Sequence, residues 1–324
     1  GKEYLLGVCA SLPDGSEAWY YMRIVEQDQG HVNEMLALAE EFSSKTYKYS
    51  DAQSLAMYME TSPSANSSAL GTVTLKDTFT QLTWGSLGVE RTGEAYTKLK
   101  ELSGNLANVE ITTHVTAKDG EKTETYEVTE NFTMKWASQR IYMMDYERTM
   151  NQIFDGGSEQ YSGKRIMLGI SDSHGLQELR SPNGEYQAFV VNRELWMYSR
   201  TDSQSTRVFS FRQSETDEMA NLQDYGIKLL SAGDDGTVDF LVSGYMSRGS
   251  HEGGVGVSLW RYEKGTNTLT ERLYLPANES SEELLMGMDT LSCLSSSGTC
   301  TFLWEIPFIP WIRRPARPRF WQRG

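Results

Sequence analysis

The chain has 324 residues, and 44 aspartates and glutamates against 30 lysines and arginines give it a formal net charge of −14. Such an acidic chain is a poor partner for the phosphate backbone of nucleic acids or for an anionic membrane surface. No run of about eighteen residues is apolar throughout, so the chain contains no candidate transmembrane helix. Its three cysteines are too few for a disulfide framework, and its length suits two domains of ordinary size.

The first half of the chain, residues 1–160, mixes strand and helix patterns and is expected to be an α+β region. Two apolar and aromatic runs within residues 3–26 flank a Pro-Asp-Gly turn, which predicts a β-hairpin. Apolar residues at helical spacing predict an amphipathic helix over residues 31–44. Alternating residues on either side of a second turn predict another hairpin within residues 109–128.

Two further helices are predicted from apolar spacing in the same half, over residues 92–102 and 142–154. The residues at helical spacing are Ala95, Leu99 and Leu102 in the first stretch, and Met143, Tyr146, Met150 and Ile153 in the second. Two glycines at 156–157 follow the second stretch and are typical of a helix end. The α+β region should therefore contain strands and two or three short helices.

Strand patterns dominate residues 161–303, and turn residues separate them at the spacing expected of short antiparallel strands. Strands are predicted over residues 165–170, 187–191, 194–198, 207–211, 226–230, 238–242, 255–262 and 271–275.

Part of this region repeats. The sequence Ser-Pro-Asn-Gly at 181–184 begins a strand, and Leu-Trp-Met-Tyr follows at 195–198. Asp-Gly at 235–236 begins a second such strand, and Leu-Trp-Arg-Tyr follows at 259–262. Internal repetition of this kind predicts an architecture built from repeated sheets. The residues that define the repeat are Pro182, Gly184, Trp196, Tyr198, Gly236, Trp260 and Tyr262.

The first cassette resembles the Ser-Pro-Asp-Gly motif of TolB-type, WD40-like β-propeller repeats, with Asn183 in place of the usual aspartate. The strand at 195–198 takes the place of that family's Ile-Tyr-x-Met strand. The resemblance implies a mainly β fold in which the C-terminal region is a complete or partial propeller. As a whole, the chain also resembles signal-anchored proteins of gut Firmicutes without a known activity.

The last residues, 304–324, differ from the rest in composition. They hold three of the eight tryptophans, four of the eight prolines, five arginines and one acidic residue. A coding sequence read one base out of frame from Leu303 permits a peptide that completes a third cassette, so we expect this tail to be a frameshifted product; the alternative is a natural basic tail. If it is frameshifted, the natural protein continues beyond this chain.

The second cassette differs from the first by an insertion at residues 244–254. One hypothesis places a ligand site there, formed by Tyr245, Arg248, His251 and Glu252. Arg248 would bind a carboxylate or phosphate through paired hydrogen bonds, and His251 with Glu252 would transfer a proton. The interpretation that we favour from the sequence is a long solvated hairpin loop without a binding role.

We expect no catalytic residues, no metal and no cofactor. Ser171 to His174 place a hydroxyl, a carboxylate and an imidazole side by side, but the members of a catalytic triad usually converge from separate segments. His31 and His114 have no second histidine or cysteine at metal-ligand spacing. The sequence also lacks a glycine-rich phosphate-binding motif.

These features together predict a non-enzymatic, extracytoplasmic module that binds a protein or a glycan of the cell envelope through a propeller-like surface. The chain begins Gly1-Lys2 without methionine, so we expect that a natural signal or membrane anchor preceded it and supplied its only link to the membrane. The alternative function is an extracytoplasmic hydrolase acting on a carbohydrate or peptide, with Asp172 and Glu252 as acid and base.

Overall fold

The computed structural model contains two compact units. Residues 1–7, 21–155 and 162–173 belong to the first unit, and residues 8–20, 156–161 and 174–324 to the second. The structure describes residues 2–11, 15, 17–26, 31–60, 70–119, 122–157, 160–162, 165–213, 225–277, 281, 284–285, 287–288, 292–294, 300–302 and 319–321.

The predicted N-terminal hairpin is confirmed. Strands β1 (Lys2–Ser11) and β2 (Glu17–Glu26) pair in a two-stranded sheet. No helix in the described parts of the chain has the length and apolar character that crossing a membrane requires.

Helix α1 (Val32–Thr46) confirms the amphipathic helix predicted over residues 31–44. It buries Met35, Ala39 and Phe42 on one face, at the spacing of three to four residues that places side chains above one another on a helix. A 3₁₀-helix, η1 (Asp51–Tyr58), follows it. The four-residue α2 (Phe79–Leu82) begins with a capping box, in which Thr78 and Gln81 satisfy each other's backbone N–H groups.

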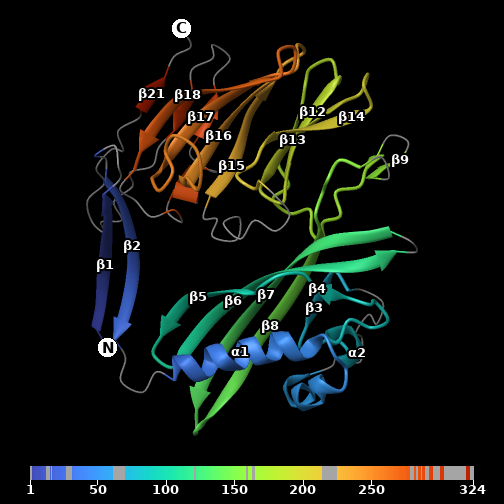
Figure 1. Ribbon diagram of the computed structural model, residues 1–324, viewed down its shortest axis with the longest axis vertical. Helices are drawn as coiled ribbons and strands as arrows, with labels where there is room; N and C mark the ends of the chain where they lie inside the picture. The colour runs from blue at the N-terminus through green and yellow to red at the C-terminus, as the bar shows by residue number, and fades with distance from the viewer. Residues whose placement is uncertain are drawn as a thin grey trace. The chain divides into compact units, whose positions relative to one another are not determined.

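The sheet of the first unit is antiparallel, with the strand order β3-β8-β7-β6-β4, and β5 also pairs with β6. Its strands are β3 (Thr72–Thr74), β4 (Glu90–Arg91), β5 (Tyr96–Ser103), β6 (Leu106–Asp119), β7 (Lys122–Ala137) and β8 (Arg140–Gln152). The hairpin predicted within residues 109–128 is therefore confirmed as part of β6 and β7. Helix α1 lies across one face of the sheet (Figure 1), and Phe42 contacts the rings of Phe132 and Tyr146 there.

The two further predicted helices are wrong, because both stretches form strands. Residues 142–154 fall largely in β8, and residues 92–102 fall largely in β5. Each strand contains a register shift that inserts one extra residue into the ladder.

The extra residue explains why each strand was predicted to be a helix. In β8, Met143 pairs with Met134 and Asp145 pairs with Thr133, so Met144 is left between two rungs and is exposed. Side chains normally alternate between the faces of a strand, but the inserted residue brings Met143 and Tyr146 onto one face three positions apart. The same shift in β5 places Leu99 and Leu102 opposite residues on one face of β6. Apolar residues three positions apart also lie on one face of a helix, so the spacing alone predicts a helix in both stretches.

The second unit contains two consecutive four-stranded antiparallel sheets in which each strand pairs with the next along the chain, the arrangement of a propeller blade. The first sheet is β11 (Glu178–Arg180), β12 (Tyr186–Val191), β13 (Glu194–Ser199) and β14 (Gln204–Phe209). The second sheet is β15 (Tyr225–Ala232), β16 (Thr237–Tyr245), β17 (Val255–Glu263) and β18 (Thr268–Pro276). The protein is thus mainly β, as predicted. Two short strands, β9 (Tyr161–Ser162) and β10 (Arg165–Ile166), form a separate pair.

The sequence repeat corresponds to a structural repeat. Phe189 lies opposite Trp196 in the first sheet, and Phe240 lies opposite Trp260 in the second. Both sheets also shift register between the leucine and the tryptophan of the repeated strand. The shared aromatic pair and the shared bulge show that Trp196 and Trp260 hold equivalent positions.

Apolar side chains from both sheets form one core, which includes Leu195, Phe209 and Phe240. The opposite face of the second sheet is also covered, because Leu241 and Leu259 pack with Leu284 and Met288 in a separate cluster. The second sheet is therefore buried on both faces, as expected of a blade inside a propeller. Phe240 and Leu241 are consecutive residues of β16, and they pack on opposite faces of the sheet: Phe240 in the core shared by both sheets, Leu241 in the separate cluster.

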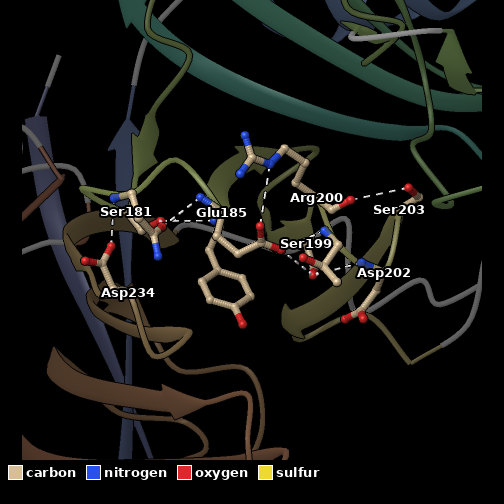
Figure 2. Close-up of polar contacts among 10 residues, drawn as sticks. Ser181, Glu185, Ser199, Arg200, Asp202, Ser203 and Asp234 are labelled. Atoms are coloured by element: carbon tan, nitrogen blue, oxygen red, sulfur yellow. Dashed lines mark hydrogen bonds and ion pairs between the residues drawn. The ribbon is translucent and has the colours of Figure 1, made fainter.

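The turns that begin the two cassettes contact each other (Figure 2). The backbone N–H of Asn183 donates to the carboxylate of Asp234 at 2.8 Å. The side-chain oxygen of Asn183 accepts from the N–H of Glu185, and Asp235 accepts from the N–H of Thr237 in the same way. These turn residues are therefore used in folding the cassettes and joining them.

A third sheet consists of β19 (Ser292–Leu294), β20 (Cys300–Phe302) and β21 (Arg319–Trp321). Strand β21 is the described part of the tail that we expect to be frameshifted, and it pairs with β20. The other residues of 304–324 lie outside the described residues, and the interpretation of the tail stays a prediction.

Candidate functional site

The insertion in the second cassette lengthens the hairpin between β16 and β17. Met246 donates its backbone N–H to Gly254, and Gly253 returns a hydrogen bond to the carbonyl of Met246, at 2.8 and 2.9 Å. A turn closes the tip, where the N–H of Gly254 also lies 3.0 Å from the carbonyl of His251. The excursion is thus a hydrogen-bonded extension of the sheet, which gives its side chains defined positions.

A cavity of about 150 Å³ opens beside this hairpin extension. Its walls are mainly apolar and aromatic, and polar groups from the extension, β17 and β18 converge on it. The residues that line it are Phe209, Phe211, Met246, Arg248, Gly249, Ser250, His251, Ser258, Trp260 and Glu271. We call this space the loop cavity.

Glu271 organises the polar side of the loop cavity. Its carboxylate accepts a hydrogen bond from the hydroxyl of Ser258 and lies 3.1 Å from Nε2 of His251. The imidazole of His251 stacks on the ring of Tyr274, with 3.7 Å between centroids and 7° between planes. Burial, and to a smaller extent the charge of Glu271, raises the pKa of Tyr274, so this phenol stays neutral.

Arg248 is a lining residue whose side chain is held in place by a backbone carbonyl. Its Nε donates to the backbone carbonyl of Phe211 at 3.0 Å, and Phe211 follows the last strand of the first sheet. The hairpin extension of the second sheet is therefore tied to the end of the first. A guanidinium held in this way is part of a preformed wall.

Two of the four predicted ligand-binding residues, Arg248 and His251, line the loop cavity. Glu252 is exposed at the tip, and Tyr245 is half-buried at the end of β16; neither is among the lining residues. Glu271 was missed because it lies on a different strand, and only the register of β17 and β18 places it opposite Trp260. Trp260, which also lines the cavity, is one of the residues that define the sequence repeat.

Ser258, His251 and Glu271 lie together at the loop cavity, yet these three side chains are not arranged for nucleophilic catalysis. A nucleophilic serine must donate its proton to the histidine base. Here the hydroxyl of Ser258 donates to Glu271 instead, and Ser258 is only 1% exposed. The alternative acid and base, Asp172 and Glu252, belong to the first and second unit respectively, and their catalytic role stays a prediction.

A second polar cluster lies inside the first unit, between α1 and the sheet. The buried carboxylate of Glu130 accepts hydrogen bonds from the hydroxyls of Ser43 and Tyr146. Burial raises the pKa of Glu130, although these hydroxyls and the charge of Arg148 act in the opposite direction. Burial likewise raises the pKa of the Tyr146 phenol well above its usual range.

Arg148 is fully buried beside this cluster. It donates to the backbone carbonyls of Leu82 and Gln81 at 2.7 and 2.9 Å, and its guanidinium lies over the ring of Trp84 at 3.5 Å from the centroid. The two terminal nitrogens of this buried cation are satisfied by carbonyls at the end of α2 and its plane lies on an aromatic face, while its buried Nε has no hydrogen-bond partner among the described residues. This pattern fits a structural role. Within the described residues, no group of three or more histidine, cysteine, aspartate or glutamate side chains is placed to hold a metal ion.

No protein-family model matches the sequence, and no curated protein matches it significantly. Among solved structures, the chain is similar to one described as a TolB from Agrobacterium tumefaciens, at 12% identity and a TM-score of 0.21. The similarity covers 55% of this chain and 65% of that chain, slightly less than two thirds of its length. A TM-score this low carries no argument, so the propeller-like description rests on strand order and register alone.

Proposed function

We propose that the protein is a non-enzymatic, extracytoplasmic binding module, and that its second unit holds a protein or a glycan of the cell envelope. In this proposal, residues 161–303 form the binding region, and residues 1–160 form the α+β region. The observation that carries the proposal is the loop cavity, because it combines apolar walls with a polar rim beside the insertion that distinguishes the second cassette.

The size of the loop cavity limits what it accepts. At about 150 Å³ it is smaller than the pockets that enclose whole drug-sized ligands, which are about 300–1,000 Å³. It suits one side chain or one small substituent of a larger partner. Phe209, Phe211 and Met246 offer apolar contact to that group, while Arg248, His251 and Glu271 offer hydrogen bonds around it. Anchoring one buried group within a polar rim is typical of protein interfaces.

The test fills the cavity without removing any of its contacts. Ser250 is an exposed lining residue, so Ser250→Trp should occupy the space. Thr266→Trp, in the exposed turn between β17 and β18, is the matched control. Thermal unfolding is measured with envelope peptides and cell-wall glycan fragments. A ligand at a hundredfold excess over its Kd should stabilise the wild type and the control by about 2.7 kcal/mol. Equal stabilisation of Ser250→Trp would show that the loop cavity is not the binding site.

A further inference from the structure

A larger groove lies along α1 in the first unit. It encloses about 590 Å³, within the range of about 300–1,000 Å³ that is typical of ligand sites. Its walls come from α1, from the end of η1 and from the adjoining ends of β7 and β8. We call it the α1 groove.

Helix α1 carries a second stripe beside the fully buried one of Met35, Ala39 and Phe42. Glu34, Ala37, Leu38 and Glu41 face the groove at intervals of three and four residues, so they form a continuous stripe along nearly two helical turns. This stripe extends about 10 Å along the helix, at 1.5 Å per residue. That length matches about three residues of an extended peptide, at roughly 3.3 Å each.

The floor of the groove is apolar, and the side chains that form it are already positioned. Leu38 and Met143 pack partly against the core of the unit. Met57 projects at the rim with 76% of its surface exposed. At one end, the ring of Trp136 stacks on His31 with 3.7 Å between centroids. Exposed apolar groups gathered in a concave site are typical of a recognition surface.

The charges of the groove are predominantly negative. Glu34, Glu41 and Glu60 contribute carboxylates, whereas Arg140 is the one lysine or arginine among the lining residues and lies over the ring of Tyr142 at 4.1 Å. Glu34 pairs with His31 and Glu41 with Lys45, yet their side chains remain 55% and 53% exposed. The two carboxylates flank Leu38 on the helix stripe, so an apolar position lies between two anionic ones.

We propose that the α1 groove binds a short segment of a partner protein in which an apolar side chain is flanked by lysines or arginines. The apolar side chain contacts Leu38 and Met143, and the flanking cations approach Glu34 and Glu41. The partner segment then presents a cation, an apolar group and a cation to the anion, apolar group and anion of the helix stripe. An acidic segment is disfavoured for the same reason.

The experiment measures fluorescence anisotropy of the labelled pentapeptide Gly-Lys-Leu-Lys-Gly with the full chain at low salt. The double variant Glu34→Gln/Glu41→Gln removes the two charges, and Glu90→Gln/Glu147→Gln removes two exposed charges from other positions of the same unit. Two exposed pairs at about 0.5 kcal/mol each are worth about 1 kcal/mol, so the groove variant should bind about fivefold more weakly, while the control should stay within about twofold.

A second pair of variants tests the apolar contact. Leu38→Ser should weaken peptide binding, whereas Met144→Ser, at an exposed methionine outside the groove, should not. Circular dichroism checks that each variant is folded. The proposal is overturned by equal binding of Gly-Glu-Leu-Glu-Gly, by equal weakening in groove and control variants, or by no binding of the basic peptide up to millimolar concentration.

Discussion

The indole N–H of Trp196 donates a hydrogen bond to the carboxylate of Glu194, two residues earlier on the same strand, at 3.2 Å. Trp260 occupies the equivalent position of the second sheet, but its indole nitrogen is buried and has no hydrogen-bond partner in the described structure. Ser258 stands where the first sheet has Glu194, and its hydroxyl is engaged by Glu271. One cassette therefore satisfies a buried donor that the other leaves unsatisfied.

This difference predicts unequal effects of the same substitution. Trp196→Phe removes a hydrogen bond, while Trp260→Phe removes a donor whose desolvation is not compensated. Both lose similar ring area, so we expect Trp260→Phe to be less destabilising by about 1 kcal/mol or more. Urea unfolding of the two variants measures the difference. Equal losses would mean that Trp260 has a partner in solution.

Gly236 lies in the turn between β15 and β16 and has no room for a larger side chain. Its φ is +77°, and a Cβ there would lie 2.8 Å from Cβ of Lys264. Gly249, in the hairpin extension, has a φ of +93° but open space around it. Gly249→Ala should therefore cost only backbone strain, about 1 kcal/mol, and Gly236→Ala should cost at least about 1 kcal/mol more. Thermal unfolding of both variants checks the order, and the prediction fails if Gly249→Ala is the more destabilising.

Glu130 should make the stability of the first unit depend on pH. Burial raises its folded-state pKa above the ordinary value of 4.5, so the folded state binds the proton more tightly than the unfolded state. The contribution of Glu130 to the free energy of unfolding is then fully present below pH 4.5, and it is lost as the pH rises through the folded-state pKa. Glu130→Gln, which stays neutral, should gain stability relative to the wild type over that range.

Melting temperatures of the wild type and Glu130→Gln from pH 4 upward test this sign. Other carboxylates titrate in both proteins, so the quantity to follow is the difference between the two curves. A difference that stays constant or moves against the variant as the pH rises would contradict the assignment of a raised pKa to Glu130.

Arg148 and Arg140 form a matched pair for measuring the value of an arginine over an aromatic ring. Arg148 is buried over Trp84 and donates to two carbonyls, whereas Arg140 is exposed over Tyr142. Arg148→Lys cannot keep both hydrogen bonds and the stacking, and we expect it to cost about 2–4 kcal/mol. Arg140→Lys should cost less than about 0.5 kcal/mol. Denaturant unfolding measures the free energy that each variant loses. Similar losses would show that burial does not increase the contribution of an arginine over an aromatic ring.

The predictions made from local patterns succeeded where the signal was local. Helix α1 has apolar residues at helical spacing, and the cassette strands are short runs of β-favouring residues between turn residues, so their type was predictable. The strands β5 and β8 were predicted as helices because one inserted residue changes the spacing from two to three. A bulge exists only relative to the partner strand, so the sequence of one strand does not reveal it.

The sequence by itself determined the mainly β character, the repeat that places Trp196 and Trp260 at equivalent positions, and the position of the insertion that carries Arg248 and His251. These features depend on residues close together in the chain, whose spacing and turn preferences act locally. Only the tertiary structure decided that Glu271 faces His251 and that Glu130 and Arg148 are buried together, because strand register and packing bring together side chains whose separation in sequence implies no contact.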